Sequence, residues 1–289
     1  MAVVSLPPTG FNVLRALDTY RFLTVSQMLR LGVANDPGNL RKVLGRMVSA
    51  RRDANGIPRQ KEIGVLDFGV LPRIGRLSRL YFLAPEGAAL LAEADRDRPD
   101  PKPVLHAVRF RNDYFHRVNT IDFHITLSQF AEANGHEITL TRQYFNRLPK
   151  TGNTPPRPST SIDLKPGYID PDSIYMLRDP DGTERLLLVE IANGHQVDRV
   201  VKKLPLYGKA LAQDKINHAF DYGSRAPRVL WLFDQPRTLE LVQQRAADDD
   251  WAQASMLYFF MRPLAETTPD SLCEQWQRPL PDRDRVSLF

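Results

Sequence analysis

Cysteine and long apolar runs are almost missing from this chain. The sequence contains one cysteine, Cys273, among its 289 residues. A single thiol excludes an internal disulfide and a zinc site built from several cysteines. No segment approaches the roughly 18 consecutive apolar residues that a membrane-spanning helix needs. The first residues, MAVVSLPPTG, lack the charged start and apolar stretch of a secretory signal. We therefore expect a protein of the reducing cytoplasm with no membrane span.

The composition indicates a globular protein with a basic surface. Hydrophobic residues make up 42%, and the formal net charge is +5. The length is enough for two domains, each with its own core. A polar, proline-rich stretch, DRDRPDPKP, separates them and predicts a linker. We expect domains at 1–95 and 104–289, and the positive charge favours a polyanionic partner.

The first domain has the element order of a winged helix-turn-helix. Thr24 followed by Gln27 is a capping-box pattern, which predicts the start of a short second helix. A third helix carries an apolar stripe on one face and basic residues on the other. The expected helices and strands are 10–20, 25–31, 37–51, 62–68, 78–83 and 85–94.

This arrangement predicts that the first domain binds double-stranded DNA. In a winged helix, the third helix enters the major groove and the wing contacts phosphates. The candidate contacts are Asn39, Arg41, Lys42 and Arg46 in the helix, and Arg73, Arg76 and Arg79 in the wing. The alternatives are a solvated basic face on a small α/β domain, or a winged helix that contacts other proteins.

The second domain reads as a mixed sheet flanked by helices, so the fold class is α/β (α+β). A proline in a helix interior bends or breaks the helix, so Pro205 is expected to interrupt the helix after the hairpin. The expected segments are a helix at 104–134, a strand at 137–145, a hairpin at 168–191, a helix at 196–213, a strand at 228–233, a helix at 237–247 and a strand at 255–261.

The hairpin brings two acidic residues together. Its turn, DPDGT, is strong turn chemistry. If the hairpin is symmetric about Asp181, Arg178 faces Glu184 and Asp172 faces Glu190. Directly opposed residues have Cβ atoms about 5 Å apart. Two carboxylates so placed repel each other, and they require a cation, a proton or hydrogen-bond donors.

The winged helix, the strand at Asp172, the strand at Glu190 and the helix with Lys203 and Tyr207 together resemble the replication-relaxation family. That family includes the MobC-type mobilisation proteins of plasmids and integrative elements. The resemblance covers about residues 10–235 and rests on short motifs. It implies a second domain similar to the PD-(D/E)xK restriction-endonuclease fold. It also implies conjugative mobilisation, by a relaxase or by a protein that positions the nicking complex, with other mobilisation or replication proteins as partners.

The sequence departs from the nuclease pattern at one position. That pattern has an acidic residue, and then acid-x-Lys on the next strand. Here Asp172 and Glu190 supply the acids and are candidate ligands of Mg²⁺ or Mn²⁺. Ala192 stands where a nuclease carries lysine, on the same face of the strand as Glu190. The missing lysine weakens the simple hydrolytic interpretation.

Other side chains could complete a catalytic site. Lys203, or its neighbour Lys202, could reach back from the next helix. Tyr207 could attack a phosphodiester, and His195 could act as a general base or metal ligand. The alternatives are core packing for Tyr207, a loop or capping role for His195, and a structural role for the acidic pair.

The sequence is compatible with three functions. The first is a DNA-processing enzyme of a mobile element that nicks or cleaves at a transfer or replication origin. The second is a non-enzymatic DNA-binding accessory factor or regulator with a degenerate nuclease-like domain, which Ala192 favours. The third is a protein-interaction platform that does not bind DNA.

Overall fold

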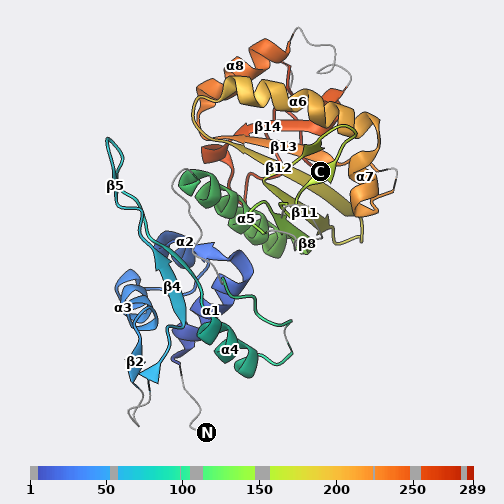
Figure 1. Ribbon diagram of the computed structural model, residues 1–289. Coiled ribbons are helices and arrows are strands. Elements are labelled where there is room, and N and C mark those ends of the chain that lie inside the picture. Colours follow the sequence, from blue (N-terminus) through green and yellow to red (C-terminus); the bar gives the residue numbers. More distant parts are fainter. Residues whose placement is uncertain are drawn as a thin grey trace. The chain divides into compact units, whose positions relative to one another are not determined.

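The computed structural model describes residues 6–52, 58–97, 99–104, 113–146, 157–223, 225–247, 255–280 and 285–289. The chain divides into two compact units, Met1–Ile125 and Thr126–Phe289. Each contains helices and strands, which confirms the predicted mixed α and β class (Figure 1). The division falls within helix α5 (Tyr114–Asn134). The narrower boundaries predicted from the linker, 1–95 and 104–289, stay predictions.

Among the described residues of the first unit, four helices precede α5. They are α1 (Pro8–Tyr20), α2 (Val25–Arg30), α3 (Pro37–Met47) and α4 (Pro85–Ala94). The predicted capping box starts α2: the Gln27 N–H donates to Thr24 Oγ1 at 3.2 Å, and the Thr24 N–H donates to Gln27 Oε1 at 2.9 Å. Asp36 caps α3 by accepting from the Asn39 N–H. Helix α3 ends four residues earlier than predicted, because a new strand begins at Arg51.

In the described part of the first unit, the strands form three small sheets. The largest is antiparallel, in the order β1 (Phe22–Leu23), β7 (Leu80–Leu83), β4 (Ile63–Leu66). A second pair joins β2 (Arg51–Arg52) to β3 (Pro58–Arg59), and a third joins β5 (Val70–Leu71) to β6 (Gly75–Arg76). Strands β5 and β6 form a hairpin inserted between β4 and β7.

The second unit is built on a mixed five-stranded sheet. Its order is β14 (Phe259–Pro263), β13 (Arg228–Phe233), β12 (Glu184–Ala192), β11 (Ser173–Arg178), β8 (Glu137–Gln143). Strands β8, β11 and β12 are antiparallel, whereas β12, β13 and β14 are parallel. The remaining elements are β9 (Ile162–Asp163), β10 (Tyr168–Ile169), α6 (Val197–Ala212), α7 (Lys215–Phe220) and α8 (Pro236–Ala246).

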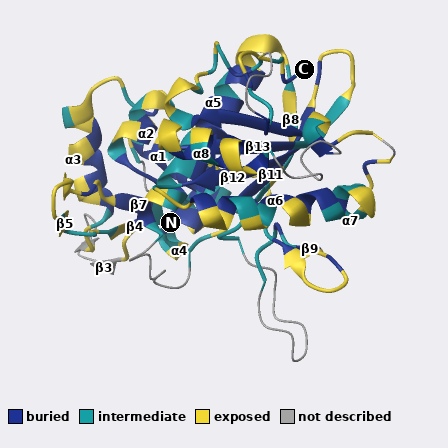
Figure 2. Cartoon of the chain, turned by 90° about the horizontal axis from the view of Figure 1, so that it is seen from above, coloured by how far each residue is buried: buried dark blue, intermediate teal, exposed yellow. Residues whose placement is uncertain are grey.

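Helix α6 covers the face of the sheet that carries Glu190. Successive residues of a strand point to opposite faces, so Glu190 shares its face with Leu188 and Ala192. These two apolar residues pack in one core cluster with Val200 and Leu204 of α6. The central strands are buried along most of their length (Figure 2). The acidic residue therefore lies under a helix, within the main core.

The predicted interruption of α6 at Pro205 is wrong, because α6 is continuous through this residue. Pro205 lies on the exposed side of the helix. The carbonyl four residues earlier loses its N–H partner, and on this side solvent can satisfy it. As a result, the residues before and after the proline stay on one helical face.

Two other predicted elements also differ. The segment predicted as a strand at 255–261 begins with a 3₁₀ turn, Met256–Tyr258, and the strand itself is Phe259–Pro263. The helix predicted from 104 is described only from Tyr114, because 105–112 lie outside the described residues. Among the described helices, none combines the length and the apolar character needed to cross a membrane.

Candidate functional site

The hairpin β11–β12 has the register predicted from its turn. Arg178 lies opposite Glu184, and the pairing continues to Ser173 opposite Val189. The Asp172 N–H extends this ladder by donating to the Val189 carbonyl at 2.8 Å. The structure therefore brings Asp172 beside Glu190, as expected.

Both carboxylates of this pair are buried, and both accept hydrogen bonds. The Ile191 N–H donates to Asp172 Oδ2 at 2.6 Å. Glu190 Oε1 lies 2.5 Å from Lys203 Nζ. The Tyr207 hydroxyl donates to the same Glu190 oxygen. A cation and several donors thus balance the two acids, and we call Asp172, Glu190, Lys203 and Tyr207 the carboxylate cluster.

Helix α6 supplies the cation and the hydroxyl. Lys203 and Tyr207 are four residues apart, which places them on one face of the continuous helix. Lys203 Nζ also donates to the Asp170 carbonyl at 2.9 Å, which holds the amine between strand and helix. The Tyr207 ring meets Trp231 edge-on, with ring centroids 6.1 Å apart. Tyr207 is therefore a core residue with a bonded hydroxyl, the alternative weighed for it.

Burial shifts the protonation of the cluster. Loss of solvation raises the pKa of Glu190 to about 7, Lys203 opposes this rise, and the charge of Asp172 adds to it. Burial, together with the charge of Glu190, also raises the pKa of Tyr207 well above its usual range. Tyr207 consequently keeps its proton at neutral pH. This state suits a hydrogen-bond donor better than a nucleophile.

His195 and Ala192 are not part of the carboxylate cluster. His195 is exposed in the bend between β12 and α6, whereas the acidic pair is buried. Ala192 is buried beside Phe233 of β13 and packs in the core. The structure thus places an amine at Glu190 from α6, instead of from the strand position of a typical nuclease. It does not place an imidazole there.

A divalent cation fits this arrangement poorly. Mg²⁺ requires about six oxygen ligands in near-octahedral geometry. Two carboxylates supply few of these, and Glu190 Oε1 is already shared by Lys203 and Tyr207. Across the described part of the chain, no three His, Cys, Asp or Glu side chains gather as a metal-binding group. The ammonium of Lys203 balances part of the acidic charge.

In the first unit, helix α3 turns a polar face to solvent. Its opposite face buries an apolar stripe formed by Leu40, Val43, Leu44 and Met47. Figure 2 shows exposed residues along the outer side of this helix. The exposed side chains include the four predicted DNA contacts of this helix, Asn39, Arg41, Lys42 and Arg46.

A groove joins this helix face to the β5–β6 hairpin. It has a volume of about 490 Å³, and its lining includes Arg41 and Gly45 of α3, Arg76 of β6, and Arg79 in the segment between β6 and β7. Arg73, the third predicted wing residue, is exposed at the hairpin tip. Three of the predicted DNA contacts therefore line one concave basic surface.

Asp67 forms ion pairs with two arginines of this groove, and no sequence pattern predicted these contacts. Its Oδ2 lies 2.8 Å from Arg76 Nη2 and 2.9 Å from Arg79 Nε. The Gly69 N–H donates to Asp67 Oδ1 at 3.0 Å. This backbone hydrogen bond, followed by those from the two arginines, lowers the pKa of Asp67 to about 2. One acidic residue in an otherwise basic loop was the signal available in the sequence.

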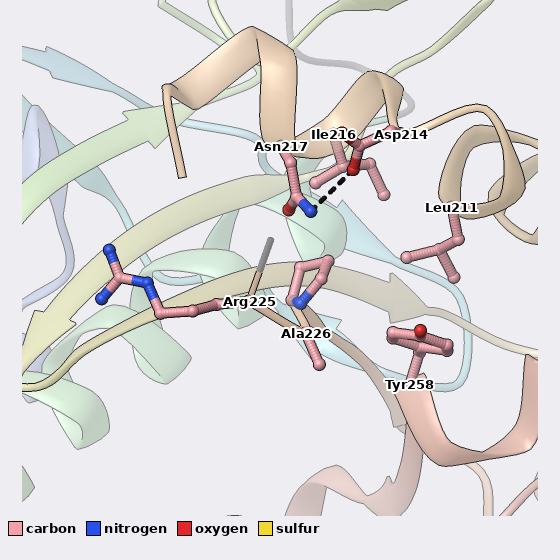
Figure 3. A pocket seen from close by; sticks show the side chains of 8 residues that line it. Leu211, Asp214, Ile216, Asn217, Arg225, Ala226 and Tyr258 are labelled. Atoms are coloured by element: carbon pink, nitrogen blue, oxygen red, sulfur yellow. Dashed lines mark hydrogen bonds between the residues drawn. The ribbon is translucent and has the colours of Figure 1, made fainter. Parts of the chain in front are cut away.

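The second unit also has a pocket that no sequence motif indicated (Figure 3). It has a volume of about 270 Å³ and is lined by residues from the end of α6, from α7 with its N-cap, and from the segments before β13 and before β14. Asn217 Nδ2 donates to Asp214 Oδ1 at 2.7 Å. Within the described residues, Asn217 Oδ1 is buried without a hydrogen-bond partner. No residue of the carboxylate cluster lines this pocket.

Comparisons of the chain with protein-family models, with curated proteins and with solved structures found no match. The resemblance to the replication-relaxation family therefore stays a prediction that rests on short motifs. The support for a function therefore comes from the residues of the two units.

Proposed function

We propose that this protein binds double-stranded DNA through its first unit and acts at a transfer or replication origin of a mobile element. The observation that carries the proposal is the basic groove between α3 and the β5–β6 hairpin. Three arginines line it, and Arg41 of α3 is more than 30 residues from the other two, Arg76 and Arg79.

The dimensions of α3 support a DNA-reading role. The helix has 11 residues, which gives it a length of roughly 16 Å. The major groove of B-DNA is about 12 Å wide and admits a helix. Arginine can bond guanine through two N–H groups, and asparagine can do the same with adenine. Arg41 and Asn39 on the exposed face supply both chemistries, and Lys42 suits phosphate contact.

The β5–β6 hairpin corresponds to the wing of the proposed winged helix. Arg76 and Arg79 are held by Asp67 in the free protein, so part of their charge is already neutralised. A DNA phosphate offers a competing anion to both guanidinium groups. Binding then exchanges an exposed ion pair for contacts with phosphate, and this exchange makes the affinity depend strongly on salt.

The link to a mobile element rests on the family resemblance. The second unit supports it, because a mixed sheet carries Asp172 and Glu190 in the expected pairing. Lys203 brings an amine to Glu190, whereas Ala192, at the usual lysine position, has none. This contact favours a second candidate function, the cleavage of a phosphodiester at the carboxylate cluster.

The burial of the cluster favours the non-enzymatic version. Glu190 is 4% exposed, and one of its oxygens is engaged by two protein groups. Mg²⁺ or Mn²⁺ could use the pair only if Lys203 moved away from that oxygen. We therefore place DNA binding first, with the second unit as an accessory domain for other mobilisation or replication proteins.

Fluorescence anisotropy with a labelled duplex tests DNA binding. We expect Arg41→Ala to weaken binding by about 10-fold. Arg237→Ala is a matched control, because this exposed arginine lies on α8 of the second unit and pairs with Glu240. Equal affinities of the two variants, or no duplex binding by the full chain at low salt, would refute the proposal.

A nicking assay distinguishes the enzymatic version of the proposal from the accessory version. The full chain is incubated with supercoiled DNA that carries the element's origin, in Mg²⁺ or Mn²⁺. Nicked circles that disappear with Lys203→Met and with Glu190→Gln would establish the enzymatic version. Duplex binding without nicked circles would establish the accessory version.

A further inference from the structure

The β5–β6 hairpin exposes two large aliphatic side chains, one in its first strand and one at its tip. Val70 is 70% exposed and Ile74 is 61% exposed. Single exposed aliphatic residues are ordinary on protein surfaces. Here two of them occupy one short hairpin, with Arg73 between them in sequence. This combination of apolar and cationic groups indicates a partner that is anionic and also offers an apolar surface.

The base of the hairpin is fixed, so the exposure of the tip is not a loose-loop effect. Leu77 and Leu80 form a buried cluster, against which Leu71 packs. The Leu77 N–H donates to the Gly69 carbonyl at 3.0 Å. Asp67 adds the two ion pairs described above. Figure 1 shows the hairpin as a narrow extension from the body of the first unit.

The pairing of the strands decides which side chains turn outward. Val70 pairs with Arg76, and Leu71 pairs with Gly75. Because neighbouring residues of a strand face opposite sides, Leu71 packs inward and Val70 faces solvent. The tip turns tightly through Arg73 and Gly75, whose φ angles are 65° and 92°.

Duplex DNA matches this surface in charge and in chemistry. Proteins that occupy the minor groove combine arginine with apolar wedges that part the stacked bases and kink the duplex. The groove that holds Arg76 and Arg79 directs the same duplex toward the hairpin. An isolated apolar partner would not use the arginines, and phosphate alone would not use the aliphatic side chains.

We propose that Ile74, supported by Val70, is a wedge that enters the minor groove beside the basic groove and kinks the bound DNA. Arg73 contacts the groove walls next to it. This inference rests on the proposed function, since it requires the duplex to lie against α3 and the hairpin. It adds a bent-DNA product and a preference for sites at which bases unstack readily.

Two labelled duplexes of identical length test the wedge with the full chain. One is fully paired, and the other has a central two-base mismatch, where unstacking costs less. Energy transfer between the ends reports bending, and anisotropy reports affinity. We expect the wild type to bend the paired duplex and to prefer the mismatch by about 5- to 10-fold.

Ile74→Ser is expected to reduce this preference below about 2-fold and to straighten the bound duplex, while salt-dependent binding remains. Ile74→Met keeps an apolar wedge and should retain bending. Leu257→Ser is the matched control, because Leu257 is 69% exposed in the second unit. It should leave both readouts unchanged.

Several results would overturn the wedge. One is duplex binding without bending or mismatch preference, which leaves the proposed function intact. Another is equal behaviour of Ile74→Ser and wild type. A wild-type dimer that becomes a monomer in Ile74→Ser, measured by sedimentation without DNA, would assign the tip to contacts between copies. Failure of the wild type to bind either duplex would refute both proposals.

Discussion

The carboxylate cluster makes a quantitative prediction about stability and pH. Glu190 is buried, and burial raises its pKa from 4.5 to about 7. The perturbation is Glu190→Gln, which resembles the protonated carboxyl group and keeps an oxygen that can accept from Tyr207. It removes the titration without opening a cavity.

The raised pKa of Glu190 determines how the free energy of unfolding changes with pH. Between about pH 4.5 and 7, the folded protein holds a proton on Glu190 that the unfolded chain releases. The free energy of unfolding is therefore highest, as far as Glu190 contributes, below pH 4.5, and it falls as the pH rises toward 7. One pKa unit corresponds to about 1.4 kcal/mol, so the full shift corresponds to about 3 kcal/mol.

Urea unfolding followed by tryptophan fluorescence measures this effect selectively. All three tryptophans, at positions 231, 251 and 276, belong to the second unit. We expect wild type and Glu190→Gln to have similar stabilities at pH 4.5. At pH 8 the variant should be more stable than wild type by about 3 kcal/mol. Parallel pH profiles of the two proteins would refute the buried, proton-linked cluster.

Four further predictions follow from named contacts. Lys203→Met removes the partner of a buried charge, so it should destabilise the second unit at pH 8 by about 3–5 kcal/mol and much less at pH 4.5, measured by the same fluorescence assay; an equal loss at both pH values would contradict this. Asp67→Asn frees Arg76 and Arg79 but keeps an oxygen for the Gly69 N–H, so duplex affinity should rise about 3- to 10-fold in anisotropy, and weaker binding would contradict it. Lys42→Ala should reduce the slope of log affinity against log salt by about 1 if this side chain contacts phosphate, whereas an unchanged slope would place it elsewhere. Burial lowers the pKa of His124 to about 4, so the first unit should lose stability as the pH falls from about 6.5 to 4 in urea unfolding followed by circular dichroism, and His124→Gln should remove that loss.

The hairpin register was predictable because local chemistry determines it. The DPDGT turn has few favourable conformations, and the length and type of a hairpin turn fix which residues of the two strands lie opposite each other. The same reasoning explains the capping box at Thr24, where both hydrogen bonds join residues three apart. Patterns of this range are readable from one sequence.

The surroundings of Glu190 were only partly predictable. The sequence offered Lys202, Lys203 and His195 as possible replacements for the missing lysine, without deciding among them. The outcome depends on how α6 lies across the sheet and on whether Pro205 interrupts it. The cost of that proline depends on its exposure, which is a property of the folded chain.

Contacts between loops were the least predictable. Asp67 pairs with arginines 9 and 12 residues away, across a hairpin whose strands are only two residues long. Strands this short give no periodic signal. The pocket at Asn217 likewise joins α7 to segments that are distant in the sequence, 225–227 and Tyr258.

Hydrogen–deuterium exchange of the full chain, with and without a duplex, tests the central claim most directly because it locates the DNA-contacting surface. DNA that lies in the basic groove should slow exchange in residues 37–47 of α3 and in residues 69–79 of the hairpin. Slower exchange confined to the second unit, with DNA bound, would contradict the account.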